Sequence, residues 1–300
     1  MRTLQMQTAL SRTRCAPTSK RDQFVLLSLA KYHFLTVEQV ARLHYGKSEN
    51  FVGQRLAEFA RGKLLARQEL SVPRLNGNRP YVYCLGNTGR RYLETQGFEV
   101  GKRLHHSPRH PHKYSGLDHT LTLNDFLISL ELFCRAHPRC SITRLVHERT
   151  FKQQGSYDRV AVQVGDAPEE QLSVQPDAWV EITTPSGPQW LTVEVDMGTE
   201  TQTHWRKKIR GLVAWLHEGY QQRFGTRETL LLVLAIPGEA HRCTLEQWTR
   251  AELELLRCER LASRFLFTHV HPGKVPHDSM CLKPVWYSLS ERAPTALFMP

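Results

Sequence analysis

Long apolar runs are absent from this sequence of 300 residues. No stretch approaches the roughly 20 apolar residues that a helix needs to cross a bilayer. The N-terminal segment MRTLQMQTALSRTRCAPTSK has basic residues but lacks the uninterrupted apolar core of a secretory signal. We therefore expect a soluble cytoplasmic protein that has no membrane as a partner.

Paired cysteines and the glycine motifs of nucleotide sites are also missing. The seven cysteines are odd in number and include no Cys-x-x-Cys pair, which argues against a disulfide framework and against a cysteine zinc site. No GxxxxGKS/T or GxGxxG motif follows a predicted strand, so nucleotide hydrolysis and dinucleotide binding have no support. The GxSxG elbow of serine hydrolases is absent as well. We expect the cysteines to be reduced, structural thiols.

Acidic residues are scarce in the first third of the chain. Residues 1–116 carry 20 Lys and Arg against 7 Asp and Glu, a net charge of +13, whereas residues 117–300 carry 20 against 22. Neutralising nucleic-acid phosphates releases condensed counterions, so a concentrated positive charge favours a polyanion-binding module joined to a nearly neutral domain. A basic surface without a partner is the alternative.

The pattern over residues 22–98 predicts three short helices followed by a β-hairpin. Asp22 can cap the first helix, and Thr36 with Gln39 forms a capping box at the start of the second. The strand-like runs KLLARQEL and YVYCL then flank SVPRLNGNRP, which contains the Asn-Gly turn signal. This order predicts a winged helix-turn-helix, in which the third helix fits the major groove of DNA.

The predicted third helix has one apolar and one polar face. Ser48 can cap it, and Val52, Leu56 and Phe59 follow helical spacing on the apolar face. The opposite face is polar and mildly basic, and two arginines flank the hairpin turn. The candidates for DNA contact are therefore Asn50, Gln54, Arg55, Arg61, Lys63, Arg74 and Arg79. A winged helix used for protein contact is the alternative, but the positive charge favours double-stranded DNA.

Two further segments complete the predicted domain organisation. Residues 1–21 form a basic N-terminal tail. Residues 99–116, EVGKRLHHSPRHPHKYSG, have no apolar periodicity and are rich in Pro, Gly, His and Arg, which indicates an interdomain linker. The histidines of this segment are more simply part of a polar linker than a metal site. Residues 117–300 then form the second domain.

The second domain has the pattern of an α/β fold. LDHTLTLNDFLISLELFCRAH predicts a long helix, ITRLVHERTF a strand, and TPSGP a turn between two β-rich runs. A helix over about 201–221, the apolar strand TLLLVLAIP, a helix over 239–260 and the strand RFLFTHV follow. The order αβββαβαβ predicts a mixed sheet covered by helices.

Carboxylates gather on the two β-rich runs. Glu194 and Asp196 share one face of their strand, because residues i and i+2 point to the same side. Asp177 follows Pro176 at the start of the preceding strand, and a hairpin at TPSGP would bring it beside them. Three converging carboxylates suit a hard cation, so we predict a site for Mg²⁺ or Mn²⁺.

These residues resemble a nuclease superfamily. Pro176-Asp177, then Glu194-x-Asp196, then lysine on the next helix is similar to the PD-(D/E)xK pattern. More narrowly, FLTVEQVARL, YVYCLGNTG, LDHTLTLNDF, QPDAWVEI and VEVDMGTETQTHWRKKIRGL resemble the replication-relaxation family, which is associated with plasmids and mobile elements. The resemblance covers roughly residues 22–235 and implies a winged helix joined to a restriction-endonuclease-like α/β fold.

The resemblance also implies roles for single residues. Asp177 and Glu194 match the two metal-binding acids of the superfamily. Asp196 stands where the superfamily usually has lysine, so we expect an ammonium group to come from the following helix, from Lys208 or Lys207. The predicted catalytic set is thus Asp177, Glu194, Asp196 and Lys208, with the metal on the three acids. Lys207, His119 and Glu148 are candidates for a supporting role, although His119 could equally cap a helix and Glu148 could face solvent.

Two functions follow from this pattern. One is a Mg²⁺-dependent DNA endonuclease or nickase, acting in replication, relaxation or mobilisation with a recombinase, relaxase or replication initiator as partner. The other is a non-catalytic DNA-binding replication or transcription factor that keeps an inactive nuclease fold. A third idea rests on His269-Val270-His271, a histidine pair of the tyrosine-relaxase type with Tyr287 nearby. This three-residue match is weak evidence.

Overall fold

The structure, a computed structural model, describes residue 17 and residues 19–46, 49–70, 81–100, 116–153, 158–165 and 168–298. The chain divides into two compact units, Met1–Asn124 and Asp125–Pro300. Within the described ranges, every helix is too short or too polar to span a bilayer.

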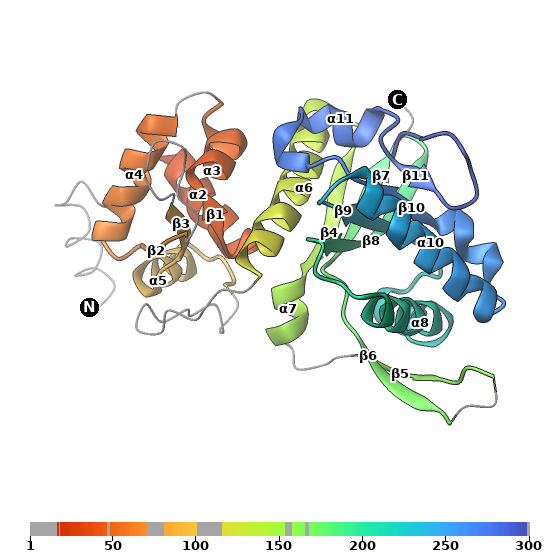
Figure 1. The fold of residues 1–300 in the computed structure, drawn as a ribbon. Coiled ribbons are helices and arrows are strands. Elements are labelled where there is room, and N and C mark those ends of the chain that lie inside the picture. Colours follow the sequence, from red (N-terminus) through yellow and green to blue (C-terminus); the bar gives the residue numbers. More distant parts are fainter. Residues whose placement is uncertain are drawn as a thin grey trace. The chain divides into compact units, whose positions relative to one another are not determined.

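The first unit has the element order expected of a winged helix (Figure 1). Its strands form a three-stranded antiparallel sheet in the order β1-β3-β2, in which β2 and β3 are the arms of the predicted hairpin. The tip of this hairpin, residues 71–80, lies outside the described residues. The elements are α2 (Lys20–Tyr32), β1 (Leu35–Thr36), α3 (Val37–His44), α4 (Glu49–Arg61), β2 (Leu65–Glu69), β3 (Tyr81–Leu85) and α5 (Asn87–Thr95).

Capping residues set the starts of the first two helices. In α3 the capping box of Thr36 and Gln39 is confirmed, since each side chain accepts a hydrogen bond from the other's backbone N–H. The prediction that Asp22 caps the first helix is wrong. Ser19 is the N-cap of α2, and Asp22 is its reciprocal partner at the third helical position, with both hydrogen bonds at 3.2 Å.

Two glycines bring the end of β3 against the start of β2. A Cβ on Gly89 would lie 2.2 Å from the carbonyl oxygen of Leu64, and one on Gly86 would lie 2.5 Å from that of Lys63. The Gly86 N–H donates a hydrogen bond to the Leu64 carbonyl at 2.8 Å. Only glycine permits this close approach of backbones. This explains why both of these positions in the stretch YVYCLGNTG are glycine.

The division between the units falls inside α6 (Leu117–Ala136). The start of this helix packs in the first unit because the Gln39 side chain donates to the Leu121 carbonyl at 2.8 Å, and the Asn124 amide donates to the Phe34 carbonyl at 2.7 Å. The predicted linker over residues 99–116 lies almost wholly outside the described residues.

The second unit is a mixed α/β fold. Its main helices and strands follow the predicted order αβββαβαβ, and the segment between the first two strands of the sheet adds a short helix and a two-stranded hairpin. The predicted helix over 239–260 is shorter in the structure and is followed by a 3-10 helix. The elements after α6 are β4 (Ser141–His147), α7 (Glu148–Gln153), β5 (Asp158–Val162), β6 (Glu170–Val174), β7 (Ala178–Thr184), β8 (Gly187–Asp196), α8 (Gln202–Glu218), α9 (Tyr220–Phe224), β9 (Leu230–Ala235), α10 (Glu239–Leu255), η1 (Glu259–Arg264), β10 (Phe265–Thr268), η2 (Pro272–Lys274), α11 (His277–Leu282) and β11 (Tyr287–Ser288).

Six strands form the main sheet in the order β11-β10-β9-β8-β7-β4. The pairs β8–β9 and β9–β10 are parallel, whereas β4–β7, β7–β8 and β10–β11 are antiparallel. The hairpin of β5 and β6 is a separate sheet that contacts α8 (Figure 1). The β7–β8 turn at Gly187 has φ +110°, which favours glycine at this position of the predicted TPSGP turn.

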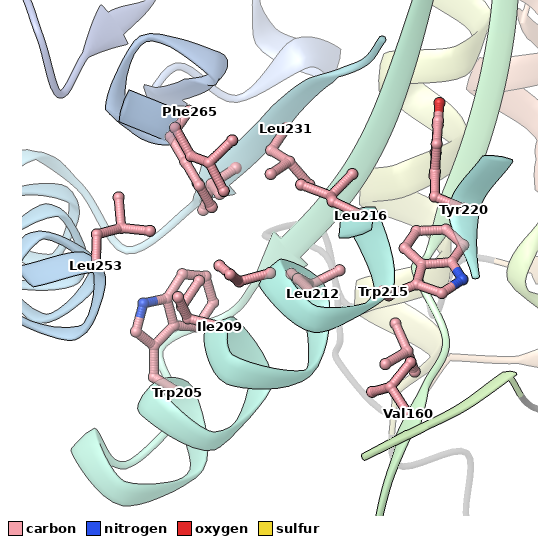
Figure 2. Close-up of a cluster of buried hydrophobic side chains, with 14 of the residues drawn as sticks. Val160, Trp205, Ile209, Leu212, Trp215, Leu216, Tyr220, Leu231, Leu253 and Phe265 are labelled. Atoms are coloured by element: carbon pink, nitrogen blue, oxygen red, sulfur yellow. The ribbon is translucent and has the colours of Figure 1, made fainter. Parts of the chain in front are cut away.

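A core of large side chains holds α8 on this sheet (Figure 2). Trp205 and Ile209 of α8 lie in one cluster with Leu231 of β9 and Phe265 of β10, and each of the four is at most 1% exposed. The Trp205 indole N–H donates to Thr249 of α10 at 2.9 Å, so the buried donor is satisfied. Burial of each such side chain contributes about 1.5–3 kcal/mol before the cost of ordering. This packing fixes α8, the helix that carries Lys208.

Candidate active site

Asp177 and Glu194 lie beside each other on neighbouring strands. The register pairs Ala178 with Val193, so the residues one step further, Asp177 and Glu194, stand opposite each other. The Asp177 N–H donates to the Val193 carbonyl at 3.0 Å, and the Val195 N–H donates to Asp177 Oδ2 at 2.8 Å. The two predicted metal-binding acids therefore share one end and one side of the β7–β8 pair.

Lys208 of α8 reaches this pair of strands. Its Nζ lies 2.7 Å from Glu194 Oε2 and 3.9 Å from Glu200 Oε1, and the Glu194 side chain is only 2% exposed. Burial by itself would lower the pKa of Lys208, but the charges of Glu194, Asp177 and Glu200 outweigh it and raise this pKa above the ordinary lysine value. Lys208 is therefore an ammonium ion at neutral pH.

Glu148 joins Asp177 from the other neighbouring strand. Glu148 begins α7 directly after β4, and its N–H donates to the Asp177 carbonyl at 2.7 Å. Among the described residues of the second unit, the carboxylates of Glu148 and Asp177 bring ligand atoms within 4.8 Å of each other. Carboxylate oxygens are the ligands that Mg²⁺ and Mn²⁺ prefer. The buried Glu148 side chain thus does not face bulk solvent. The supporting role predicted for His119, a residue of the first unit, stays a prediction.

Asp196 points to the same helix-covered side as Glu194 but has different partners. Its Oδ2 contacts Nε2 of His241, in the first turn of α10, and its Oδ1 accepts a hydrogen bond from the Gly198 N–H at 3.1 Å. The Asp196 side chain is only 1% exposed, and these two contacts give each of its oxygens a partner within the protein. A metal-binding role for Asp196 stays a prediction.

Lys207, the other lysine of this helix turn, points elsewhere. It pairs with Glu170 of β6, and the two side chains are 50% and 51% exposed. Exposed pairs of this kind contribute little to stability. Lys207 and Lys208 are therefore neighbours in sequence with different electrostatic surroundings.

Five of the candidate DNA-contacting residues, those that the structure describes, lie on α4 and just after it. Asn50, Gln54, Arg61 and Lys63 are exposed, as predicted from the helical spacing, and Val52, Leu56 and Phe59 on the opposite face are buried.

Arg55, unlike these exposed candidates, is half-buried. Its guanidinium pairs with Asp22 and with Glu58, each at 2.8 Å, and only 14% of the side chain is exposed. Arg55 therefore ties α4 to α2, and a DNA contact through it would have to break this pair. Arg74, Arg79 and the predicted cap Ser48 lie outside the described residues.

The two histidines of the relaxase-like motif have different surroundings. The His271 Nδ1 accepts a hydrogen bond from the Gly273 N–H at 3.0 Å and caps η2, whereas the His269 ring centre lies 6.1 Å from that of Tyr287. Tyr287 lies in β11 as expected, with the Arg242 guanidinium 3.7 Å from its ring centre. These contacts give His271 a structural role.

Sequence reasoning did not identify His241 or Glu200. His241 follows β9, and because β8 and β9 are parallel, the helix that follows β9 begins beside the end of β8 where Asp196 lies. That topology was a usable signal for His241. Glu200 lies two residues before α8 and had no pattern to mark it.

Comparison with known proteins supports the resemblance. No curated protein and no solved structure matches the chain. The profile of the family described as Replication-relaxation matches residues 26–230, which is more than half of the chain and includes Asp177, Glu194 and Lys208. The chain therefore belongs to the replication-relaxation family.

Proposed function

We propose that the protein binds DNA through its first unit and hydrolyses phosphodiester bonds at a divalent-metal site in its second unit, as an endonuclease or nickase. One observation carries this proposal: the ammonium group of Lys208 contacts Glu194, which stands opposite Asp177 on the adjacent strand. Membership of the replication-relaxation family supports a role in replication or mobilisation, for which a recombinase, relaxase or initiator is the proposed partner.

The donor set suits the proposed cation. Asp177, Glu194 and Glu148 offer hard carboxylate oxygens, which Mg²⁺ and Mn²⁺ prefer, and we place the metal on these acids. When bound, such an ion polarises a phosphate oxygen and lowers the pKa of a coordinated water. Asp196, held by His241, would support this set at the end of β8.

Lys208 has a role that does not require proton transfer. Because neighbouring carboxylates raise its pKa, Lys208 keeps its proton at neutral pH in the metal-free protein. A fixed ammonium group beside the metal-binding acids can stabilise the negative charge that develops on phosphate and orient the attacking water. Lys208 would thereby replace the lysine that Asp196 displaces from the superfamily pattern.

A non-catalytic DNA-binding protein is the second candidate. The observation that favours it is the same ion pair, because Lys208 neutralises Glu194 without any metal and His241 does the same for Asp196 when protonated. In that case the carboxylates and their partners would serve only as structural pairs within an inactive nuclease fold.

Nicking of supercoiled plasmid with Mg²⁺ or Mn²⁺ distinguishes the two. We expect nicking by the wild type, loss of at least about 100-fold in Asp177→Asn, Glu194→Gln and Lys208→Met, and little change in Lys207→Met, which removes the neighbouring exposed lysine. Undiminished nicking in the first two variants would show that the site is misassigned. Normal DNA binding without nicking in any preparation would favour the non-catalytic function.

DNA binding by the first unit has its own test. Replacing Arg61 and Lys63 together by alanine should weaken binding of duplex DNA and reduce the slope of log affinity against log salt concentration by roughly 1–2. The reason is that each phosphate contact releases about one counterion from the DNA, and the variant makes up to two fewer contacts. Arg139→Ala, an exposed arginine of the second unit, is the matched control. Equal losses in both proteins would contradict the assignment.

A further inference from the structure

Two histidines of the second unit approach one carboxylate oxygen, in a group that shares no residue with the candidate active site. His137 Nε2 lies 3.6 Å from Asp278 Oδ1, and His277 Nε2 lies 3.3 Å from the same oxygen. His137 directly follows α6, whereas His277 and Asp278 belong to α11, far along the chain. The fold therefore brings two imidazoles and one carboxylate together.

Two of these three polar atoms have no hydrogen bond. His137 Nε2 and Asp278 Oδ1 are both buried atoms without a hydrogen-bond partner among the described residues. Their separation of 3.6 Å is longer than a hydrogen bond. Buried polar atoms normally have a partner, and an exception indicates a bound water or ion. A cation that accepts electron pairs from both nitrogens and from the oxygen would satisfy all three atoms.

The His137 ring is held in place before any ligand arrives. Its backbone N–H donates to the Phe133 carbonyl at 2.9 Å, and its carbonyl accepts a hydrogen bond from the Cys140 N–H at 2.8 Å. The imidazole lies against Phe133 with ring centres 4.5 Å apart, and Phe133 stacks on Phe298 at 5.4 Å. A ligating group that packing has already fixed loses little freedom when it binds.

Charge and exposure also favour a cation. Within the part of the chain that the structure describes, the ion-pair partners of Asp278 are these two histidines, and no lysine or arginine neutralises its carboxylate. The side chains of His137, His277 and Asp278 are 41%, 34% and 47% exposed, so an ion can enter from solvent. Neutral imidazoles leave the negative charge of Asp278 for that ion.

We propose that His137, His277 and Asp278 bind a divalent transition-metal ion of the zinc type. Zinc is bound by imidazole nitrogen and carboxylate oxygen at about 2.0–2.2 Å, so its tetrahedral ligand atoms lie roughly 3.3 Å apart. The two approaches to Asp278 Oδ1, at 3.3 and 3.6 Å, are already close to this spacing. A turn of the partly exposed His277 ring completes the set, and water takes the fourth position. Mg²⁺ does not fit, because it prefers an all-oxygen shell.

Such an ion would fasten the C-terminal segment to α6. Phe298 already packs on Phe133, and the Trp286 ring lies edge-on to Phe126 of α6 at 5.8 Å. The ion adds a link between α11 and the end of the same helix. Two of its three ligands lie beyond residue 230, where the match to the family profile ends. The metal is thus a structural clip in a part of the chain outside that match.

Nuclear magnetic resonance of imidazole nitrogens tests the site residue by residue. The full chain, labelled with ¹⁵N-histidine and freed of metal with EDTA, is titrated with Zn²⁺, and signals are assigned from His137→Gln and His277→Gln. We expect the signals of His137 and His277 to shift together with one midpoint, and Mg²⁺ to shift neither. Asp278→Asn should raise the Zn²⁺ concentration at the midpoint at least about tenfold. Glu291→Gln, which changes an exposed carboxylate of the same segment, should leave it unchanged.

Three results would overturn the proposal: Zn²⁺ shifts neither histidine, it shifts only one of them, or Asp278→Asn keeps the wild-type midpoint. His277→Gln provides a second substitution, because it should weaken the response of His137 by at least the same factor if the two rings share an ion. The plasmid-nicking test is independent of these outcomes, since the clip includes none of Asp177, Glu194 and Lys208.

Discussion

Replacing Lys208 by methionine should destabilise the second unit measurably. The substitution keeps the length of the side chain but removes the ammonium group from Glu194, whose side chain is 2% exposed. Breaking a buried ion pair by removing one partner costs about 3–5 kcal/mol, and we expect about 2–3 kcal/mol here because the Lys208 side chain is 28% exposed and water can partly replace it. Glu194→Gln in the same chain should recover most of this loss.

Urea unfolding followed by tryptophan fluorescence is the suitable assay. All six tryptophans lie between residues 179 and 286, so their emission reports on the second unit alone. Lys207→Met is the control, and its loss should stay within about 0.5 kcal/mol because its pair with Glu170 is exposed. Equal losses in the two variants would refute the reasoning, since the argument depends on the burial of Glu194.

The pH dependence of this contribution has a definite sign. The carboxylates raise the pKa of Lys208 in the folded state above its ordinary value of 10.5. The stabilisation is then fully present below about pH 10.5 and is lost as the pH rises through the raised folded pKa. The difference between wild type and Lys208→Met should therefore stay constant between about pH 6 and pH 9. A decrease within that window would show that Lys208 is deprotonated there.

The remaining predictions concern packing and thiol reactivity. Gly89→Ala should lower the free energy of unfolding of the first unit by about 1–3 kcal/mol, because its Cβ would lie 2.2 Å from the Leu64 carbonyl oxygen. Gly53→Ala in α4 meets nothing closer than 3.8 Å and should raise the free energy of unfolding by about 0.5–1 kcal/mol. Thermal melts by circular dichroism compare the two, and equal signs would contradict the packing argument. Burial raises the pKa of Cys281, so its thiol should resist iodoacetamide at neutral pH while the exposed Cys243 reacts, as mass spectrometry would show. Rapid labelling of Cys281 in the folded protein would contradict its burial.

Local patterns in the sequence were sufficient for most elements. The capping box of Thr36 and Gln39 marked the start of α3, and the i, i+4, i+7 spacing of Val52, Leu56 and Phe59 marked the buried face of α4. These signals are local, because hydrogen bonds and periodicity within a few residues produce them. The start of α2 was predicted three residues too late. Asp can occupy either the N-cap or the third helical position, and the sequence did not show that Ser19 is the N-cap and that Asp22 is its partner at the third position.

The α5 helix and the hairpin of β5 and β6 were not predicted, although both shape their units. The residues of the hairpin are polar on one side and separated by turns, so they read as a variable stretch. Their strand structure depends on burying Val160, Leu172 and Val174 against α8, which is far along the chain. Contacts of this kind leave no short-range signal.

The sequence by itself determined the two-part organisation, the mixed α/β class, the family and the pairing of Asp177 with Glu194. The physical reason is that charge distribution, hydrophobic periodicity and the register of a short hairpin depend on residues that are close in sequence. Tertiary structure alone decided that Lys208 and not Lys207 meets Glu194, and that His241 holds Asp196. The physical reason is that the rotation of α8 and α10 about their axes is set by long-range packing of buried tryptophans and leucines on the sheet, and a rotation of one residue would exchange the partners.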